Sequence, residues 1–161
     1  MIKLDDRDIK ILSVLDREGR ISKTELAKRV SLSATPCWER LQRLEKAGII
    51  SRYRAEISLK KIAPHVEVFV MAELDNHRVE TMQNFERAAE RYEEIIDCWA
   101  LGGGYDYLLR IVCHDIDTYQ RMIDQLLGEG VGLARYFTYI VTKPVKSGRL
   151  PLDLLMSGKA G

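Results

Sequence analysis

The spacing of apolar residues changes once along this 161-residue chain, close to Ala63, and this change limits the folds open to it. Before Ala63, apolar residues recur at the three- and four-residue intervals of amphipathic helices. Beyond it, side chains first alternate between two faces, as in a strand, and helical and strand-like segments then follow in turn. We therefore predict an α+β protein. Its expected parts are a helical domain, a hairpin or hinge, a second domain and a tail, over residues 1–50, 51–64, 65–145 and 146–161.

Each of the three predicted N-terminal helices begins at a residue that favours helix N-termini. The first two also carry an acidic partner three residues later, as in a capping box. These positions are Asp5 with Asp8, Ser22 with Glu25, and Ser33. The first helix is expected over about Asp6–Arg17, before Gly19, and the third ends at Gly48.

The third predicted helix has one apolar side and one polar, basic side. Trp38 lies on the apolar side with Cys37, Leu41 and Leu44, and is expected to be structural. Arg40 lies at the border, and the polar side carries Thr35, Pro36, Glu39, Gln42, Arg43 and Lys46. Two short helices joined by a tight turn, the second with an outward polar face, are typical of a helix-turn-helix that enters the DNA major groove. A small three-helix bundle with a solvated face is the other interpretation of this pattern.

The segment after Gly48, IISRYRAEIS, alternates and carries Arg52 and Arg54 on one side, which predicts a small hairpin or wing. Charge supports a nucleic-acid partner for this half of the chain. Residues 1–62 hold 15 Lys/Arg and 9 Asp/Glu, net +6, whereas residues 63–161 hold 10 and 15, net −5. Arg43, Lys46, Arg52 and Arg54 are expected to contact phosphates, whereas Thr35, Pro36, Glu39 and Arg40 are expected nearest the bases.

In the second part of the chain, the pattern predicts a strand, a helix, two strands joined by a hairpin turn, a helix and a last strand. Strands are expected over 66–74, 96–101, 107–113 and 135–142, and the helical spacing falls between the first and second and between the third and fourth. This β-α-β-β-α-β order is that of a ferredoxin-like domain. The tail from Lys143 onward contains an apolar LPLDLLM segment, which suits either a short strand or a short helix.

Two helices can cover only one face of such a sheet, so the other face requires a partner. We expect a second copy of the chain to cover it. The residues that would meet that copy are apolar and alternate with the aliphatic core residues: Phe69, Met71, Trp99, Leu101, Phe137 and Tyr139.

No metal site, cofactor site or catalytic residue is predicted. The cysteines are odd in number and far apart, and the histidines lack zinc-like spacing: Cys37, Cys98 and Cys113, with His65, His77 and His114. The GGGYD segment lacks the Lys-Ser/Thr of a phosphate loop. With no signal peptide and no apolar stretch of about 20 residues, a cytoplasmic protein without a membrane partner is expected.

Three segments together resemble the Lrp/AsnC (leucine-responsive, feast/famine) family of transcription regulators over nearly the whole chain. They are LDDRDIKIL, GRISKTELAKRVSLSATPCWERLQRLEKAGII and GGGYDYLLR. The resemblance implies a winged helix-turn-helix that binds double-stranded DNA. It also implies an effector-binding domain that responds to an amino acid or related metabolite, and dimers that assemble into octamers.

Carried onto this chain, the resemblance places the recognition helix at Ser33 through Ala47. It places the effector cleft, formed between dimers, at the turn from Gly102 to Asp106 and at the last strand near Tyr136 and Thr138. Asp106 can attract an ammonium group, and the N–H groups of Gly102, Gly103 and Gly104 can bind a carboxylate. Family members often have a small polar residue before this turn, where this chain has Leu101.

Two other functions are alternatives to this interpretation. An enzyme on the ferredoxin-like domain is disfavoured by the absence of a catalytic constellation. A ligand-independent architectural DNA-binding protein, in which the second domain serves only to oligomerise, has the same sequence features and remains open.

Overall fold

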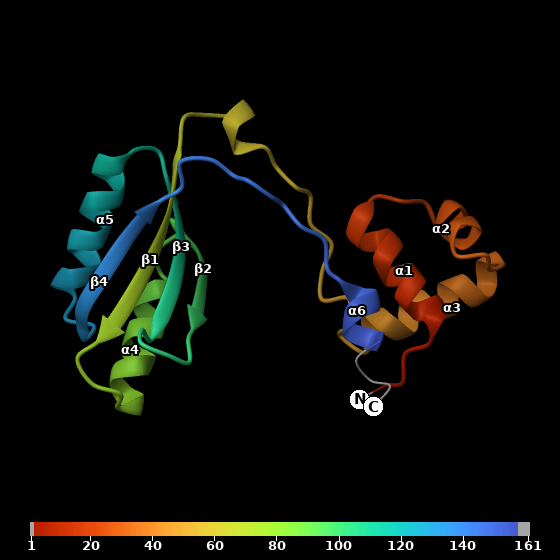
Figure 1. Ribbon diagram of the computed structural model, residues 1–161, viewed down its shortest axis with the longest axis horizontal. Coiled ribbons are helices and arrows are strands. Elements are labelled where there is room, and N and C mark those ends of the chain that lie inside the picture. The colour runs from red at the N-terminus through yellow and green to blue at the C-terminus, as the bar shows by residue number, and fades with distance from the viewer. Residues whose placement is uncertain (1, 158–161) are drawn as a thin grey trace. The chain divides into compact units, whose positions relative to one another are not determined.

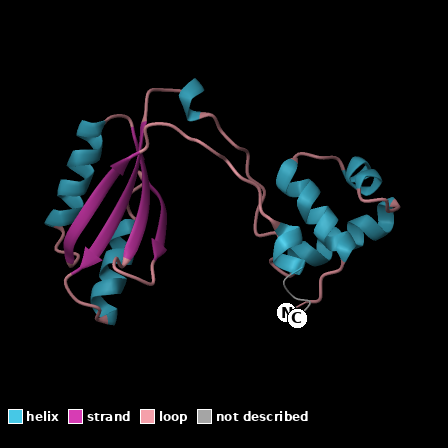
Figure 2. Ribbon diagram, viewed as in Figure 1, coloured by secondary structure: helices cyan, strands magenta, loops and turns pink. Residues whose placement is uncertain are grey.

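The computed structural model describes residues 2–157. Its contacts divide these residues into two compact units. The first unit comprises the residues up to Ile57 together with those from Lys146 onward, and the second comprises Ser58–Val145. Figure 2 shows that all strands belong to the second unit. Among the described residues, no helix is long and apolar enough to span a membrane.

The first unit is built on three helices, α1 (Asp6–Arg17), α2 (Lys23–Arg29) and α3 (Ala34–Lys46). Their apolar faces meet in one core, which confirms the predicted helical pattern. The buried residues of this core are Ile11, Leu26, Ala27, Val30, Cys37, Leu41 and Leu44. Gly48, just after α3, has a φ of +70°, a left-handed conformation that glycine adopts without strain.

The predicted N-terminal capping bonds are present in α1 and α2 and absent in α3. Asp5 and Asp8 form the complete capping box of α1, and the Ser22 side chain accepts a hydrogen bond from the Glu25 N–H at the start of α2. Ser33 occupies the N-cap position of α3, but its side chain makes no capping bond. The start of α3 therefore lacks the side-chain cap that the sequence predicts.

The hairpin predicted after Gly48 does not form. Residues 51–58 contain no strand, and the only regular element of the predicted hinge is the short 3₁₀ turn Leu59–Lys61. A strand is stable only when its backbone groups pair with a neighbour, and this alternating segment has none within the described chain. The tail forms a short helix, α6 (Leu152–Ser157), which packs against α1. Residues 158–161 of the predicted tail lie outside the described part.

The second unit is a four-stranded antiparallel sheet with two longer helices, as Figure 1 shows. Its elements are β1 (Val66–Leu74), α4 (Val79–Ala89), β2 (Ile95–Ala100), β3 (Tyr107–Cys113), α5 (Ile116–Gly128) and β4 (Leu133–Ile140). The strand order β2-β3-β1-β4 confirms the ferredoxin-like prediction. The predicted ends of β2 and β4 were displaced by one and two residues, because periodicity fixes which residues share a face more sharply than where pairing ends.

Both α4 and α5 cover the same face of this sheet. The alternate residues of β1 that point toward the helices are fully or almost fully buried, together with Phe85 of α4 and Ile123 of α5. These β1 residues are Val68, Val70, Ala72 and Leu74. The opposite face carries Phe69 and Met71, and no helix of the described chain packs on it. The two-faced pattern predicted from the sequence is therefore present.

Trp38 packs against the core of the first unit but remains partly exposed, and the Lys23 ammonium lies 3.2 Å from the centroid of its ring. We expect Trp38→Ala to destabilise this unit by about 3 kcal/mol, because it deletes a large apolar contact from a small core. Hydrogen exchange of the α2 and α3 amides in the full chain measures this loss. Trp99→Ala, in the second unit, is the matched control. A Trp38→Ala protein with wild-type protection but altered DNA preference would instead make the indole a recognition residue.

The pKa of Asp5 is lowered from 3.8 to about 2, first by the hydrogen bond from the Asp8 N–H and then by the Arg40 guanidinium. A carboxyl group with a lowered folded-state pKa adds stability above its unfolded pKa, and this stability is lost as the pH falls through the folded value. Exchange protection of α1 and α3 should therefore fall between pH 3.8 and about 2. Asp5→Asn keeps a good N-cap residue but removes this component. Identical pH profiles for both proteins would contradict the assignment.

Candidate nucleic-acid interface and ligand site

The N-terminal half of α3 presents a short row of exposed residues. Ser33, Thr35, Pro36 and Glu39 are exposed, whereas Cys37 and Leu41 on the other side of the helix are buried. Pro36 fits within the first helical turn because its missing N–H would have no helical partner there. The helix therefore offers polar groups at its N-terminal turn, the part that reaches bases in helix-turn-helix proteins.

The two arginines predicted on this helix have partners within the protein. Arg40 Nη1 lies 2.6 Å from Asp5 Oδ2 and 2.9 Å from Asp8 Oδ1, and Arg43 Nη2 lies 2.6 Å from Asp8 Oδ2. The Asp5 and Asp8 interactions raise the pKa of Arg40. From the sequence, Asp5 and Asp8 were predicted only as helix caps. The i,i+3 spacing of Arg40 and Arg43, which places both on one side of α3, was the available signal for a shared partner.

Two further contacts set the position of α3, and neither was predicted. Ser31, in the turn before α3, has a φ of +56°, and Arg7 Nη1 donates a hydrogen bond to its carbonyl oxygen at 2.7 Å. After the helix, the Tyr53 hydroxyl donates to Glu45 Oε1 at 2.7 Å. Both ends of α3 are thus fixed by side chains from neighbouring segments.

The remaining predicted phosphate ligands are exposed cations. Lys46 lies in the last turn of α3, and Arg52 and Arg54 lie in the extended segment beyond it. None of the three forms a salt bridge within the described chain, so their charges are available to a polyanion.

In the second unit, Asp106 lies where the β2–β3 turn meets the end of β1. Its Oδ2 accepts a hydrogen bond from the Leu74 N–H at 2.8 Å, and its Oδ1 lies 2.8 Å from Nε2 of His77. The Asp106 N–H also donates to the carbonyl of Ala72 at 2.9 Å. The carboxylate therefore holds the turn against β1. His77 is 73% exposed, so this partner can be displaced at low cost.

The turn itself leaves its backbone donors open. Within the described chain, the N–H groups of Gly102, Gly103 and Gly104 donate no hydrogen bond, and no atom lies within 4 Å of where a Cβ would stand on any of them. The Leu101 N–H donates a hydrogen bond to the Asp106 carbonyl at 2.8 Å, which joins the two ends of the turn. The turn thus carries three unpaired N–H donors and a carboxylate, groups that suit a ligand with both charges.

The other predicted wall, on β4, lies across β1 from Asp106, although Tyr105 of the turn reaches β4 at Phe137. Tyr136 pairs with Ala72 and packs against the helix-covered core, and Thr138 pairs with Val70. The Thr138 hydroxyl hydrogen-bonds to the hydroxyl of Tyr119 on α5. One subunit thus brings the two sets to the same end of the sheet but does not place them side by side.

The uncovered face of the sheet carries a row of large apolar side chains across all four strands. In register, the row runs Trp99, Leu108, Met71 and Phe137. Tyr105 of the glycine turn reaches this face and packs edge-on against Phe137, with the ring centroids 5.6 Å apart. Tyr105 was not among the residues predicted from the sequence, and its aromatic contact links the turn to the open face.

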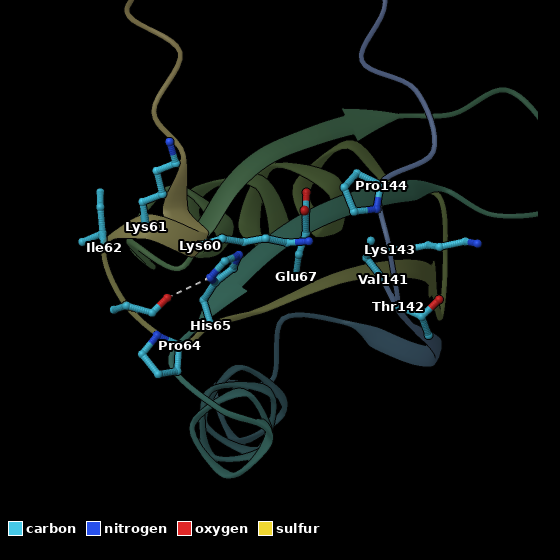
Figure 3. A pocket seen from close by; sticks show the side chains of 11 residues that line it. Lys60, Lys61, Ile62, Pro64, His65, Glu67, Val141, Thr142, Lys143 and Pro144 are labelled. Atoms are coloured by element: carbon cyan, nitrogen blue, oxygen red, sulfur yellow. Dashed lines mark hydrogen bonds between the residues drawn. The ribbon is translucent and has the colours of Figure 1, made fainter.

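A recess of about 550 Å³ in the second unit was also not predicted. It lies where the chain enters β1 and leaves β4, and its lining includes Lys60, Lys61, His65, Glu67 and Lys143. Figure 3 shows Lys60 extending toward Glu67, while Lys61 and Lys143 extend away from it. Glu67, the acidic residue of the lining, is paired with Arg110 at 2.5 Å, and the recess includes none of the predicted effector residues.

Known proteins match both units. The family model for the winged helix-turn-helix DNA-binding domain matches residues 4–51, and that for the Lrp/AsnC ligand binding domain matches residues 67–151. In the part of the chain that the structure describes, no group of His, Cys, Asp and Glu residues could hold a metal ion.

Relatives and solved structures agree with these matches. The transcriptional regulatory protein DoeX of Halomonas elongata is 48% identical, over 90% of this chain and 92% of its own length. The leucine-responsive regulatory protein of Escherichia coli is 38% identical, over 91% and 90%. A transcriptional regulator from Neisseria meningitidis, solved as a complex with L-Met, superposes with a TM-score of 0.88 at 32% identity, over 95% of this chain and 99% of that one. These relatives are transcription regulators and not enzymes. This chain belongs to the Lrp/AsnC family of DNA-binding transcription regulators, with a helix-turn-helix and a ligand-binding domain.

Proposed function

We propose that this regulator recognises specific DNA sequences by inserting α3 into the major groove. The exposed row on the N-terminal half of α3 supports this role, because groups in that turn are the ones that reach base edges. In the proposal Ser33, Thr35, Pro36 and Glu39 lie nearest the bases. Lys46, Arg52 and Arg54, which are exposed and lack carboxylate partners, contact phosphates.

Salt should weaken DNA binding steeply, because each cation that contacts a phosphate releases a counterion. For three such contacts per subunit, log K against log salt should have a slope of about −3 per bound subunit. Fluorescence anisotropy of a labelled duplex from the region upstream of the gene, at several salt concentrations, measures it.

Replacing both Arg52 and Arg54 by Gln should reduce the magnitude of this slope by about 2 per subunit. Lys3→Gln, near the N-terminus, is a control that removes one positive charge elsewhere and should leave the slope unchanged. A flat salt response of the wild-type protein would exclude phosphate contact by these residues.

The second unit, in this proposal, binds an amino-acid zwitterion at the Gly102–Asp106 turn. The observation that carries this role is that the Gly102–Gly104 N–H groups make no hydrogen bond within the described chain and share their turn with the Asp106 carboxylate. The N–H groups suit the ligand carboxylate, and Asp106 suits its ammonium group. The bound L-Met of the Neisseria relative supports an amino acid as the chemical class.

Asp106 can serve both its structural and its binding role. One oxygen holds the Leu74 N–H, and the other faces only the exposed His77 ring. An ammonium group that displaces His77 therefore leaves the turn anchored. Tyr136 and Thr138, which do not reach this turn within one subunit, contribute only if a neighbouring subunit brings them there.

Self-association through the open sheet face completes the proposal, with dimers that assemble further into octamers. The row from Trp99 to Phe137 is apolar on each of the four strands, and a second copy would remove it from water. If the ligand binds between dimers, binding and assembly are linked and each must shift the other. The alternative, an architectural DNA-binding protein, shares the assembly but has no ligand.

Asp106→Asn should weaken amino-acid binding by about ten- to a hundredfold, the effect of removing a charge-assisted contact worth about 1.5–3 kcal/mol. The asparagine oxygen can still accept the Leu74 N–H, so the turn survives. Calorimetry against each of the twenty amino acids, beginning with L-Met, finds the ligand and measures the loss. Sedimentation velocity of the same samples reports the assembly state.

His77→Ala is the matched control, because it removes the neighbour of the carboxylate and leaves the charge in place. Its affinity should equal or exceed that of the wild type. Wild-type affinity in a folded Asp106→Asn protein would limit Asp106 to shaping the turn. If none of the twenty amino acids gave binding heat in calorimetry or a change in sedimentation, the architectural alternative would be favoured.

A further inference from the structure

Asp8 is the one buried charged residue of the described chain, with a relative exposure of 0%. It lies on α1, and its two oxygens face two arginines of α3. Oδ1 is 2.9 Å from Arg40 Nη1, and Oδ2 is 2.6 Å from Arg43 Nη2. Oδ2 also accepts the N–H of Asp5 at 3.0 Å. Every bond in this cluster is charge-assisted or completes the helix cap, so the carboxylate is fully satisfied despite its burial.

The cluster changes which charges α3 can offer to DNA. Asp5 and Asp8 carry two negative charges, and Arg40 and Arg43 carry two positive charges. Free cations near phosphates supply most of the sequence-independent affinity of a DNA-binding protein. Cations that are already bound to carboxylates supply less of it, and so the ratio of specific to nonspecific binding rises.

We propose that Asp8 is a specificity-determining positioning residue. It holds the guanidinium groups of Arg40 and Arg43 against α1 and withholds them from phosphates, so that α3 discriminates through its N-terminal turn. This inference rests on the proposed insertion of α3 into DNA. It concerns Asp8 itself, which touches no base and acts only through the two arginines.

Arg43 is the group that distinguishes Asp8 from Asp5. The Arg43 side chain is 46% exposed and its carboxylate partner is Asp8 alone, whereas Arg40 is 27% exposed and bonds to both acids. Loss of the Asp8 charge therefore frees Arg43 first, while Asp5 still holds Arg40. Loss of the Asp5 charge leaves both arginines bound to Asp8. The two acidic residues thus make matched variants with different expected effects.

The test compares two duplexes of equal length, one of random sequence and one enriched by the wild-type protein from a random library. Binding of the full chain is measured over a range of salt concentrations. Asp8→Asn should bind the random duplex several times more tightly, with a salt slope steeper by about 1 per subunit, because Arg43 gains a phosphate contact. The preference for the enriched duplex should fall. Asp5→Asn should leave the slope unchanged, and Asp8→Asn combined with Arg43→Gln should restore it.

A purely structural Asp8 would give another result. Asp8→Asn would then weaken binding to both duplexes by the same factor at an unchanged slope, and this outcome would overturn the proposal. Arg43→Gln in the wild-type background keeps the test decisive if Asp8→Asn does not fold. The proposal expects this variant to keep the wild-type slope on random DNA, and a slope shallower by about 1 would refute it. Absence of salt-dependent binding by the wild-type protein would instead refute the proposed DNA contacts themselves.

Discussion

The sheet of the second unit has helices on one face only, and the register of β1 decides which residues lie on each face. Val68, Val70 and Ala72 are buried under α4 and α5, while Phe69 and Met71 point to the uncovered side. Because side chains alternate strictly along a strand, a shift of one residue would exchange the two sets. The register that builds the core therefore also determines the apolar row offered to another molecule. Pairing on both sides of β1, with β3 and β4, keeps this register fixed.

The same central strand positions the candidate ligand site. Two hydrogen bonds join Asp106 to the end of β1. The Leu74 N–H donates to the Asp106 carboxylate, and the Asp106 N–H donates to the Ala72 carbonyl. The glycine turn is thus anchored at one end, while the N–H groups of its three glycines remain open. A ligand site on a turn of this kind combines a rigid support with free donors, which reduces the ordering cost of binding.

In the first unit, the charge pattern of the sequence and the charges available to a partner differ. Residues 1–62 carry six more positive than negative charges. The structure pairs Arg40 and Arg43 with Asp5 and Asp8, which leaves the count unchanged but gives these two cations carboxylate partners within the protein. Lys46, Arg52 and Arg54 keep their charges exposed. Net charge thus indicates the class of partner, whereas the paired geometry determines which residues can contact it.

The sequence by itself determined the elements, their order and the faces they bury, because caps and periodicity act between residues close together in the chain. The capping box of α1, the bounds of β1 and the ferredoxin-like order all follow from such local signals. Contacts between distant residues were not visible in it. The Asp8–Arg43 pair spans 35 residues and exists only because α1 packs against α3. Likewise, the alternating segment 51–58 has strand-like residues but no partner strand within the described chain, so tertiary structure alone decided that it forms no hairpin.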